Sequence, residues 1–388
     1  MLLNNQKHAF YFPKDVTYLN MANQSPSFKA IHDAGLQGLS QKQHPYTISV
    51  SDYFEPVKQL KSLFAQLIEE DDYNRIALIP SASYGIATVA NNIKLNAGDE
   101  ILLIDEQFPS NVYSWKKLAK KFNATIKTVS APKSSTHLGK AWNEAILSAI
   151  NTKTAVVAMG NIHWSNGTLF DLKSIREKSS SENALLIIDG SQSVGALPFS
   201  VKEIQPDALI CAGYKWLFGP YGTAYAYFGS HFDNGAPIEE NWHNRLNSED
   251  FAGLTNYEEE YKPLGNKYDV GECANFIYVK MQIEALKQVL EWTPRDIQEY
   301  CKSISTKSIT KLENLGCRIE NSNYRTHHLF GIELPNNLDT VFLKNELEKQ
   351  KIYISIRGKY IRISCHLFNT EKDFDKLIAC IASVLIKN

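Results

Sequence analysis

Between residues 75 and 228, short apolar runs alternate with amphipathic stretches, and this alternation limits the fold more than any other feature of the chain. The runs are Arg75–Pro80, Glu100–Asp105, Thr125–Ser130, Thr154–Met159, Ala184–Asp189, Asp207–Ala212 and Thr223–Phe228. Continuous apolar runs are typical of strands covered on both faces. Helical patterns over 84–93, 111–122, 140–150 and 171–179 lie between them. Strand–helix alternation predicts an α/β fold with a mostly parallel sheet.

The pattern changes after about residue 235. Residues 239–267 are polar and aromatic with little periodicity, and helical patterns follow over 276–292 and 294–315. Shorter segments then alternate between strand and helix at 329–334, 339–350, 352–356, 360–364 and 371–386. This predicts a smaller α+β C-terminal domain. We expect a large domain over 15–255, and a small domain made of 1–14 and 256–388.

Charge, hydropathy and cysteine spacing exclude several classes of function. The 41 Lys and Arg against 42 Asp and Glu leave no basic surplus for nucleic-acid binding. The chain start lacks a signal-peptide pattern, and no apolar run approaches the roughly 20 residues of a membrane span. The six cysteines form no CxxC pair, so neither a metal site nor a disulfide framework is indicated. We therefore expect a cytoplasmic protein with no metal, nucleic-acid or membrane partner.

Polar or aromatic groups follow five of the predicted strands. The segments are 80–83 (PSAS), 105–108 (DEQF), 160–166 (GNIHWSN), 189–192 (DGSQ) and 212–215 (AGYK). In open α/β sheets, ligands bind beyond the carboxyl ends of the strands. These segments therefore predict a ligand site at that edge.

Three of these groups have a chemical and a purely structural interpretation. Ser81 and Ser83 begin a helix, where backbone N–H groups bind anions, although Ser81 could be an ordinary helix cap. Asp189 ends a very apolar strand and could hold a cationic nitrogen, or form a salt bridge or cap. Lys215 lies in apolar surroundings that would lower its pKa and favour Schiff-base chemistry, although a snorkelling lysine is commoner.

Together these groups match the needs of pyridoxal 5′-phosphate (PLP). That cofactor needs an amine for its aldehyde, a carboxylate on its ring nitrogen, an anion site for its phosphate and a flat group over its ring. Lys215, Asp189, Ser83 and Phe108 can supply them in that order.

The sequence resembles the class V aminotransferases of PLP-dependent fold type I, a family that includes cysteine desulfurases and isopenicillin-epimerase-like proteins. The resemblance runs from residues 18–23 (YLNMAN) to 362–369 (RISCHLFN), and its most specific part is 188–195 (IDGSQSVG) followed by 211–216 (CAGYKW). It implies PLP as cofactor, an amino acid as substrate and a homodimer with the active site near its interface. Segments 240–245 and 268–275 are the candidates for residues donated across that interface.

The resemblance also implies a role for each matching residue. Lys215 would form the Schiff base and move the Cα proton, and Asp189 would pair with the ring nitrogen. Gln192 and Asn166 would lie near the phenolic oxygen, with His163 as a weaker alternative from the same loop. The phosphate would be bound by Ala82, Ser83 and Tyr214, the ring would stack on Phe108, and the substrate would contact Arg362 and Asn23.

Two departures from the family pattern bear on the reaction. Cysteine desulfurases commonly stack a histidine on the ring, where this chain has Phe108, and they carry a nucleophilic cysteine shortly upstream of the carboxylate-binding arginine. Residues 350–361 contain no cysteine. Cys365 is expected to be structural, whereas Cys273 is a candidate nucleophile.

We therefore expect an enzyme acting at the Cα of an amino acid, with transamination first, an eliminating lyase or epimerase second, and a desulfurase third. A non-catalytic or nucleotide-binding α/β protein is the alternative from another class. A nucleotide site would require a GxGxxG after the first strand, and residues 81–85 (SASYG) do not match it.

Overall fold

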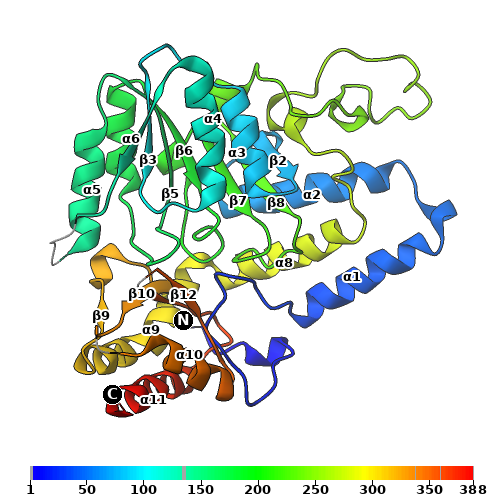
Figure 1. Cartoon of the computed structure of the whole chain (residues 1–388). Coiled ribbons are helices and arrows are strands. Elements are labelled where there is room, and N and C mark those ends of the chain that lie inside the picture. The colour runs from blue at the N-terminus through cyan, green and yellow to red at the C-terminus, as the bar shows by residue number, and fades with distance from the viewer. Residues whose placement is uncertain (1–2, 133–136, 337, 359, 388) are drawn as a thin grey trace.

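Each apolar run of the sequence forms one strand of a seven-stranded sheet in the computed structural model, which describes residues 3–132, 137–336, 338–358 and 360–387. The strand order is β2-β8-β7-β6-β5-β3-β4. The strands are β2 (Ile76–Ile79), β3 (Glu100–Ile104), β4 (Thr125–Val129), β5 (Thr154–Gly160), β6 (Leu185–Asp189), β7 (Ala208–Ala212) and β8 (Ala224–Phe228). Figure 1 shows this sheet in the upper part of the molecule.

The sheet is mostly parallel, which confirms the prediction, and β8 is the exception. It runs antiparallel to both β2 and β7. The connection from β7 to β8 contains no helix. Parallel neighbours need a long crossover, whereas antiparallel neighbours can be joined by a short loop, so this connection requires the reversed direction.

Helices cover both faces of the sheet. Side chains alternate between the faces along each strand. Ile101 and Leu103 pack with α3 (Ala82–Asn91) and α4 (Tyr113–Phe122), whereas Leu102 and Ile104 belong to the core on the opposite face. The second face is covered by α2 (Ser51–Leu67), α5 (Leu138–Ala149), α6 (Leu172–Ser181), the short α7 (Val201–Ile204) and α8 (Tyr278–Trp292).

Two N-terminal helices, α1 (Lys29–Lys42) and α2, have no counterpart in the sequence-based prediction, and both pack against α8. The α1 sequence contains Gly35 and Gly38, which lower its intrinsic helix propensity. A Cβ at Gly38 would lie 2.6 Å from the Phe276 carbonyl oxygen. The glycine that weakens the sequence signal is therefore the one that permits the close approach.

The C-terminal part forms the predicted α+β unit. It contains α9 (Pro294–Asn314), β9 (Arg318–Ile319), β10 (Leu329–Glu333), α10 (Thr340–Lys349), β11 (Ile352–Tyr353), β12 (Ser355–Arg357), β13 (Tyr360–Ser364) and α11 (Glu371–Lys387). The segment 352–356, expected as one strand, is divided. β11 pairs with β1 (Thr17–Tyr18), whereas β12 forms a hairpin with β13.

The N-terminal residues belong with this C-terminal part. The Gln6 amide donates to the Leu367 carbonyl (2.7 Å), and β1 extends the pairing to Tyr18. Figure 1 places both chain ends in this lower part of the molecule. The boundary at 15 remains a prediction, and the pairing of β1 favours placing it beyond Tyr18.

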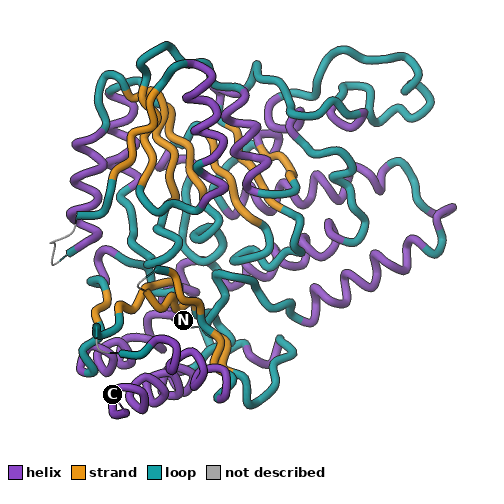
Figure 2. Tube along the Cα trace, viewed as in Figure 1, coloured by secondary structure: helices purple, strands orange, loops and turns teal. Residues whose placement is uncertain are grey.

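The polar stretch at 239–267 lies in the connection from β8 to α8, which Figure 2 shows as mostly loop. No helix in the described part of the chain has the length and apolar character that crossing a membrane requires.

Candidate active site

A cleft opens at the carboxyl ends of β2, β3, β5, β6 and β7. Its wall includes one residue from the end of each strand: Pro80, Ile104, Gly160, Asp189 and Ala212. The five segments that the sequence predicts to form a ligand site all contribute residues to this cleft, with Gln107 and Phe108 representing 105–108. The parallel direction of these strands is the reason, because it brings their carboxyl ends to the same edge of the sheet.

Lys215 follows β7 and lines this cleft with only 7% of its surface exposed. Its ammonium lies 5.4 Å from the ring centre of Phe108 and 5.6 Å from that of Tyr214. Among the described residues it forms no hydrogen bond or ion pair. Burial lowers the pKa of Lys215 to about 8, assisted by the charges of Arg362 and Arg357, while the Asp189 carboxylate opposes the shift.

Asp189 is the last residue of β6 and lies in the cleft wall. Its Oδ1 accepts a hydrogen bond from the Ser191 amide at 3.0 Å, which fixes the side chain at the strand end. No described cation forms an ion pair with it, so the salt-bridge alternative considered from the sequence does not apply. The carboxylate is left to meet a ligand in the cleft.

The start of α3 contributes to the wall of the cleft. Ser81 caps this helix, because its Oγ accepts the Tyr84 amide at 3.2 Å. Ser81 also shares a hydroxyl–hydroxyl contact of 2.9 Å with Ser83. Within the described chain, the amides of Ala82 and Ser83 have no backbone acceptor. The Ser81 cap therefore leaves N–H groups free at the helix start, where backbone donors are suited to an anion.

Two aromatic side chains, Phe108 and Trp164, also line the cleft. Phe108, which is 38% exposed, lies 5.4 Å from Trp164 in an edge-to-face arrangement. The Trp164 indole N–H donates to the Glu106 carbonyl at 2.6 Å, which ties the two loops together. Sequence reasoning placed Trp164 in a ligand segment and gave it no role. A tryptophan beside the predicted stacking residue was the available signal.

The N-terminal segment reaches the site through Ala22 and Ser25. Gln192 donates to the Ala22 carbonyl at 3.1 Å and accepts the Trp216 indole N–H at 3.0 Å, so its amide is fixed in the wall of the cleft. Ser25 donates to the carbonyl of Tyr214 at 3.0 Å. Asn23 itself is exposed and does not line the cleft.

The loop after β5 places its two candidates differently. Asn166 is buried outside the cleft, where its Oδ1 accepts the Thr168 amide at 3.0 Å. His163 does line the cleft, but both ring nitrogens are engaged, one with the Asp105 carbonyl and one with the Ser165 hydroxyl. Burial lowers the pKa of His163 to about 4. Its ring is held neutral as part of the wall.

Arg362 lies on β13 behind Trp164 and is only 2% exposed. One guanidinium nitrogen donates to the Trp164 carbonyl at 3.0 Å, while the Nε atom is buried without a partner. Burial lowers the pKa of Arg362, and the nearby charge of Arg357 adds to this. The guanidinium does not itself line the cleft, but it lies 5.8 Å from the centre of the Trp164 ring, which does.

None of the six cysteines lines the cleft, and all are free and buried. Cys365 donates to the His327 carbonyl. Cys273 lies beside His243, with Sγ 3.5 Å from Nδ1, and burial raises the pKa of this thiol far above its usual range. Neither position suits a thiolate nucleophile.

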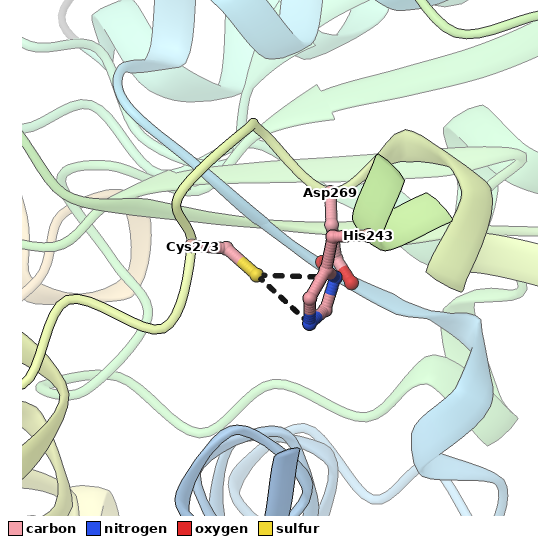
Figure 3. Close-up of side chains that lie close together, drawn as sticks. All are labelled: His243, Asp269 and Cys273. Atoms are coloured by element: carbon pink, nitrogen blue, oxygen red, sulfur yellow. Dashed lines mark hydrogen bonds between the residues drawn. The ribbon is translucent and has the colours of Figure 1, made fainter. Parts of the chain in front are cut away.

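His243, Asp269 and Cys273 bring metal-ligand atom types within 4.8 Å of one another (Figure 3). The Lys61 ammonium, however, lies 2.6 Å from one Asp269 oxygen, and the Leu78 amide donates to the other at 2.8 Å. A lysine thus already neutralises this carboxylate. The cluster joins α2, β2 and the β8–α8 connection as a buried polar contact.

Replacing Lys61 with alanine is expected to destabilise the protein by about 3–5 kcal/mol, because it leaves the Asp269 charge buried and unpaired. Both side chains are at most 2% exposed. Lys202→Ala is the matched control, because its pair with Asp71 is exposed and screened by solvent, so that its loss should change the stability little. Urea unfolding of both variants measures the difference. Equal small losses in the free energy of unfolding would show that the buried pair stabilises the protein no more than the exposed pair does.

The comparisons with known proteins agree with this architecture. The profile of the family described as "Aminotransferase class-V" matches residues 42–377. A Bacillus subtilis protein named "Uncharacterized aminotransferase YcbU" is 22% identical and aligns over 88% of this chain and 91% of its own length. A "Probable cysteine desulfurase" of Borreliella burgdorferi is 24% identical over 98% of this chain and 93% of its own.

A solved structure gives the same result for the fold. The structure of a C-DES mutant with glycine covalently linked to its PLP cofactor superposes with a TM-score of 0.86. It is 20% identical and covers 98% of this chain and 99% of its own. The likeness confirms the α/β fold of type I that the sequence predicts.

Proposed function

The chain belongs to the class V aminotransferase family, whose cofactor is PLP, and we propose that it removes the Cα proton of an amino acid at this cleft and transfers the amino group. The observation that carries the proposal is the buried, unpaired Lys215 ammonium in a cleft that also contains Asp189 and the start of α3. An ammonium without a partner is costly to bury. It is expected where the amine must react.

The side chains of the cleft fit PLP. Asp189 offers a carboxylate for a cationic ring nitrogen, and the amides of Ala82 and Ser83 offer donors for a phosphate. Phe108 offers a flat apolar face. Gln192, held by Ala22 and Trp216, has one amide hydrogen left for an oxygen in the cleft.

When bound, PLP supplies an aldehyde that condenses with amines and a ring that takes up the electron pair of the Cα–H bond. The residues of the chain move the proton and position the cofactor ring. Lys215 Nζ is the only described amine in the cleft wall, and its lowered pKa lets it accept and return the Cα proton near neutral pH. Phe108 cannot exchange protons, so it contributes stacking alone.

Uptake of PLP by the cofactor-free protein is expected to depend on pH with a midpoint near 8. An amine attacks an aldehyde only when unprotonated, and burial lowers the pKa of Lys215 from 10.5 to about 8. Uptake is therefore slow below this value and rises through it. Stopped-flow absorbance over pH 6–10 measures the profile, and a midpoint near 10 would show that Lys215 behaves as an exposed lysine.

The reaction after proton removal is where the alternatives divide. A desulfurase is disfavoured because every cysteine is buried away from the cleft. An eliminating lyase or an epimerase would use the same Lys215 and Asp189, so it is the runner-up. A screen of amino acids, with and without a keto-acid acceptor, separates these by reading keto acid, sulfide and racemate. Amino transfer consumes the keto-acid acceptor, whereas elimination releases a keto acid with ammonia and sulfide and needs no acceptor. Amino transfer should dominate, and sulfide or racemate formed without consumption of the acceptor would refute transamination.

A homodimer and a cytoplasmic location complete the proposal. Tyr268, Asp269 and Cys273 are buried within the chain, so the segment 268–275 reaches a partner only through its exposed residues. The exposed Tyr221 ring at the cleft mouth is a further surface suited to a second subunit. Analytical ultracentrifugation with cofactor tests the stoichiometry.

A further inference from the structure

Arg357 and Arg362 project from the same face of the small C-terminal sheet. In the hairpin of β12 and β13, Ser355 lies opposite Arg362. Residues opposite one another in a sheet share a face, and so do residues two apart along a strand. Arg357 is therefore the diagonal neighbour of Arg362, within reach of long side chains.

This face of the sheet is turned toward the cleft. The two guanidinium carbons lie 5.7 Å (Arg357) and 5.8 Å (Arg362) from the centre of the Trp164 ring, which lines the cleft. Gly331 lies opposite Arg362 on β10, and a Cβ there would come within 2.9 Å of the Asn166 Cα. The sheet face is thus pressed against the loop that carries Trp164.

Neither arginine has an acidic partner among the described residues. Arg357 donates to the carbonyl of its own neighbour, Ile356, at 3.0 Å. Arg362 donates to the Trp164 carbonyl and keeps a buried, unpartnered Nε. Two like charges beside one ring are unfavourable without an anion between or near them. Their arrangement indicates an anionic ligand with more than one negative group.

One of these groups is already accounted for. The resemblance to the class V family implies that Arg362 binds the α-carboxylate of the amino acid, and in the proposed function the start of α3 binds the cofactor phosphate. No role remains for Arg357. Its charge nevertheless reaches the reacting amine, because both Arg357 and Arg362 help to lower the pKa of Lys215.

We propose that Arg357 binds a second anionic group on the side chain of the substrate, so that the preferred substrates are amino acids with an acidic side chain, a carboxylate or a sulfinate. The inference rests on the proposed function and adds the substrate class to it. A planar guanidinium suits both acids because it donates two parallel hydrogen bonds. Trp164, packed against both arginines, lines the cleft beside them.

The test compares acid and amide pairs of equal size with the cofactor-loaded enzyme. L-aspartate against L-asparagine and L-glutamate against L-glutamine are the pairs, with L-cysteine sulfinate and L-alanine as further arms. The readouts are kcat/KM and the change in cofactor absorbance on mixing. Arg357→Gln should lower kcat/KM for the acids by about 10- to 100-fold and change it for the amides by less than about 3-fold. Arg357→Lys should restore part of the loss.

Two further variants separate this inference from the proposed function. Arg362→Gln should lower kcat/KM for the acids, the amides and alanine alike, because every amino acid has an α-carboxylate. Arg318→Gln, an exposed arginine on β9 that pairs with Glu333, should leave all rates unchanged. An equal loss for acids and amides in Arg357→Gln, or a wild-type preference for the amides, overturns the inference alone. If no amino acid alters the cofactor absorbance of the wild type, the proposed function fails and the inference fails with it.

Discussion

Replacing Lys215 with alanine is expected to slow exchange of the substrate Cα proton by about 10⁴-fold or more, since it removes both the amine that anchors the cofactor and the base that moves the proton. No second amine lines the described cleft. His163 does line it, but its ring nitrogens are hydrogen-bonded and its lowered pKa leaves it a weak base. The loss should therefore appear in the rate and not only in cofactor affinity.

Deuterium incorporation at Cα, followed by NMR in heavy water with saturating PLP, measures this rate. Lys262→Ala is a matched control, because Lys262 is half-buried, also has a pKa lowered by burial, and lies over Phe54, away from the cleft. This control should exchange at the wild-type rate. An undiminished rate in Lys215→Ala would mean that another group removes the proton.

Asp189→Asn is expected to weaken PLP binding and to slow Cα proton exchange, each by about 10²-fold. The amide cannot neutralise a cationic ring nitrogen, and a charge-assisted hydrogen bond is worth about 1.5–3 kcal/mol. The side chain keeps its size, and an amide oxygen can still accept the Ser191 amide. The effect should therefore be electrostatic and not a loss of fold.

Absorbance titration with PLP gives the affinity, and exchange at saturating cofactor gives the rate. Asp105→Asn is the comparison, because Asp105 follows β3 at the same edge of the sheet but does not line the cleft. It should bind PLP as the wild type does. If both variants lose PLP affinity equally, the combined negative charge at this edge of the sheet, and not the Asp189 carboxylate alone, would bind the cofactor.

The sheet could be predicted closely because its signal is local. Runs such as 184–188 are apolar throughout, and a strand covered on both faces requires nothing else. The same argument placed Asp189 and Lys215 at strand ends, which the structure brings into one cleft. The PLP assignment needed more than these positions, and it came from the resemblance to the class V family.

The missed elements depend on contacts distant in sequence. α1 is weakly amphipathic, and its Gly38 makes sense only against the backbone of Phe276 and Ile277. The division of 352–356 into β11 and β12 depends on β1, which lies more than 300 residues earlier in the chain. Local periodicity contains no information about either partner.

Side-chain direction within the site was the least predictable feature. Asn166 and His163 lie three residues apart on one loop, yet the structure turns His163 toward the cleft and Asn166 away from it. The role assigned to Asn166 therefore remains a prediction, as does that of Asn23. The diagonal placement of Arg357 beside Arg362 in the hairpin also required the register of β12 and β13.

Covalent capture of the cofactor tests the central claim most directly. The purified protein, loaded with PLP and reduced with borohydride, should carry one cofactor adduct on the peptide that contains Lys215, and the Lys215→Ala protein should carry none. Peptide mass mapping reads the position. An adduct on a different lysine, or the same adduct in the Lys215→Ala protein, would contradict the assignment of Lys215.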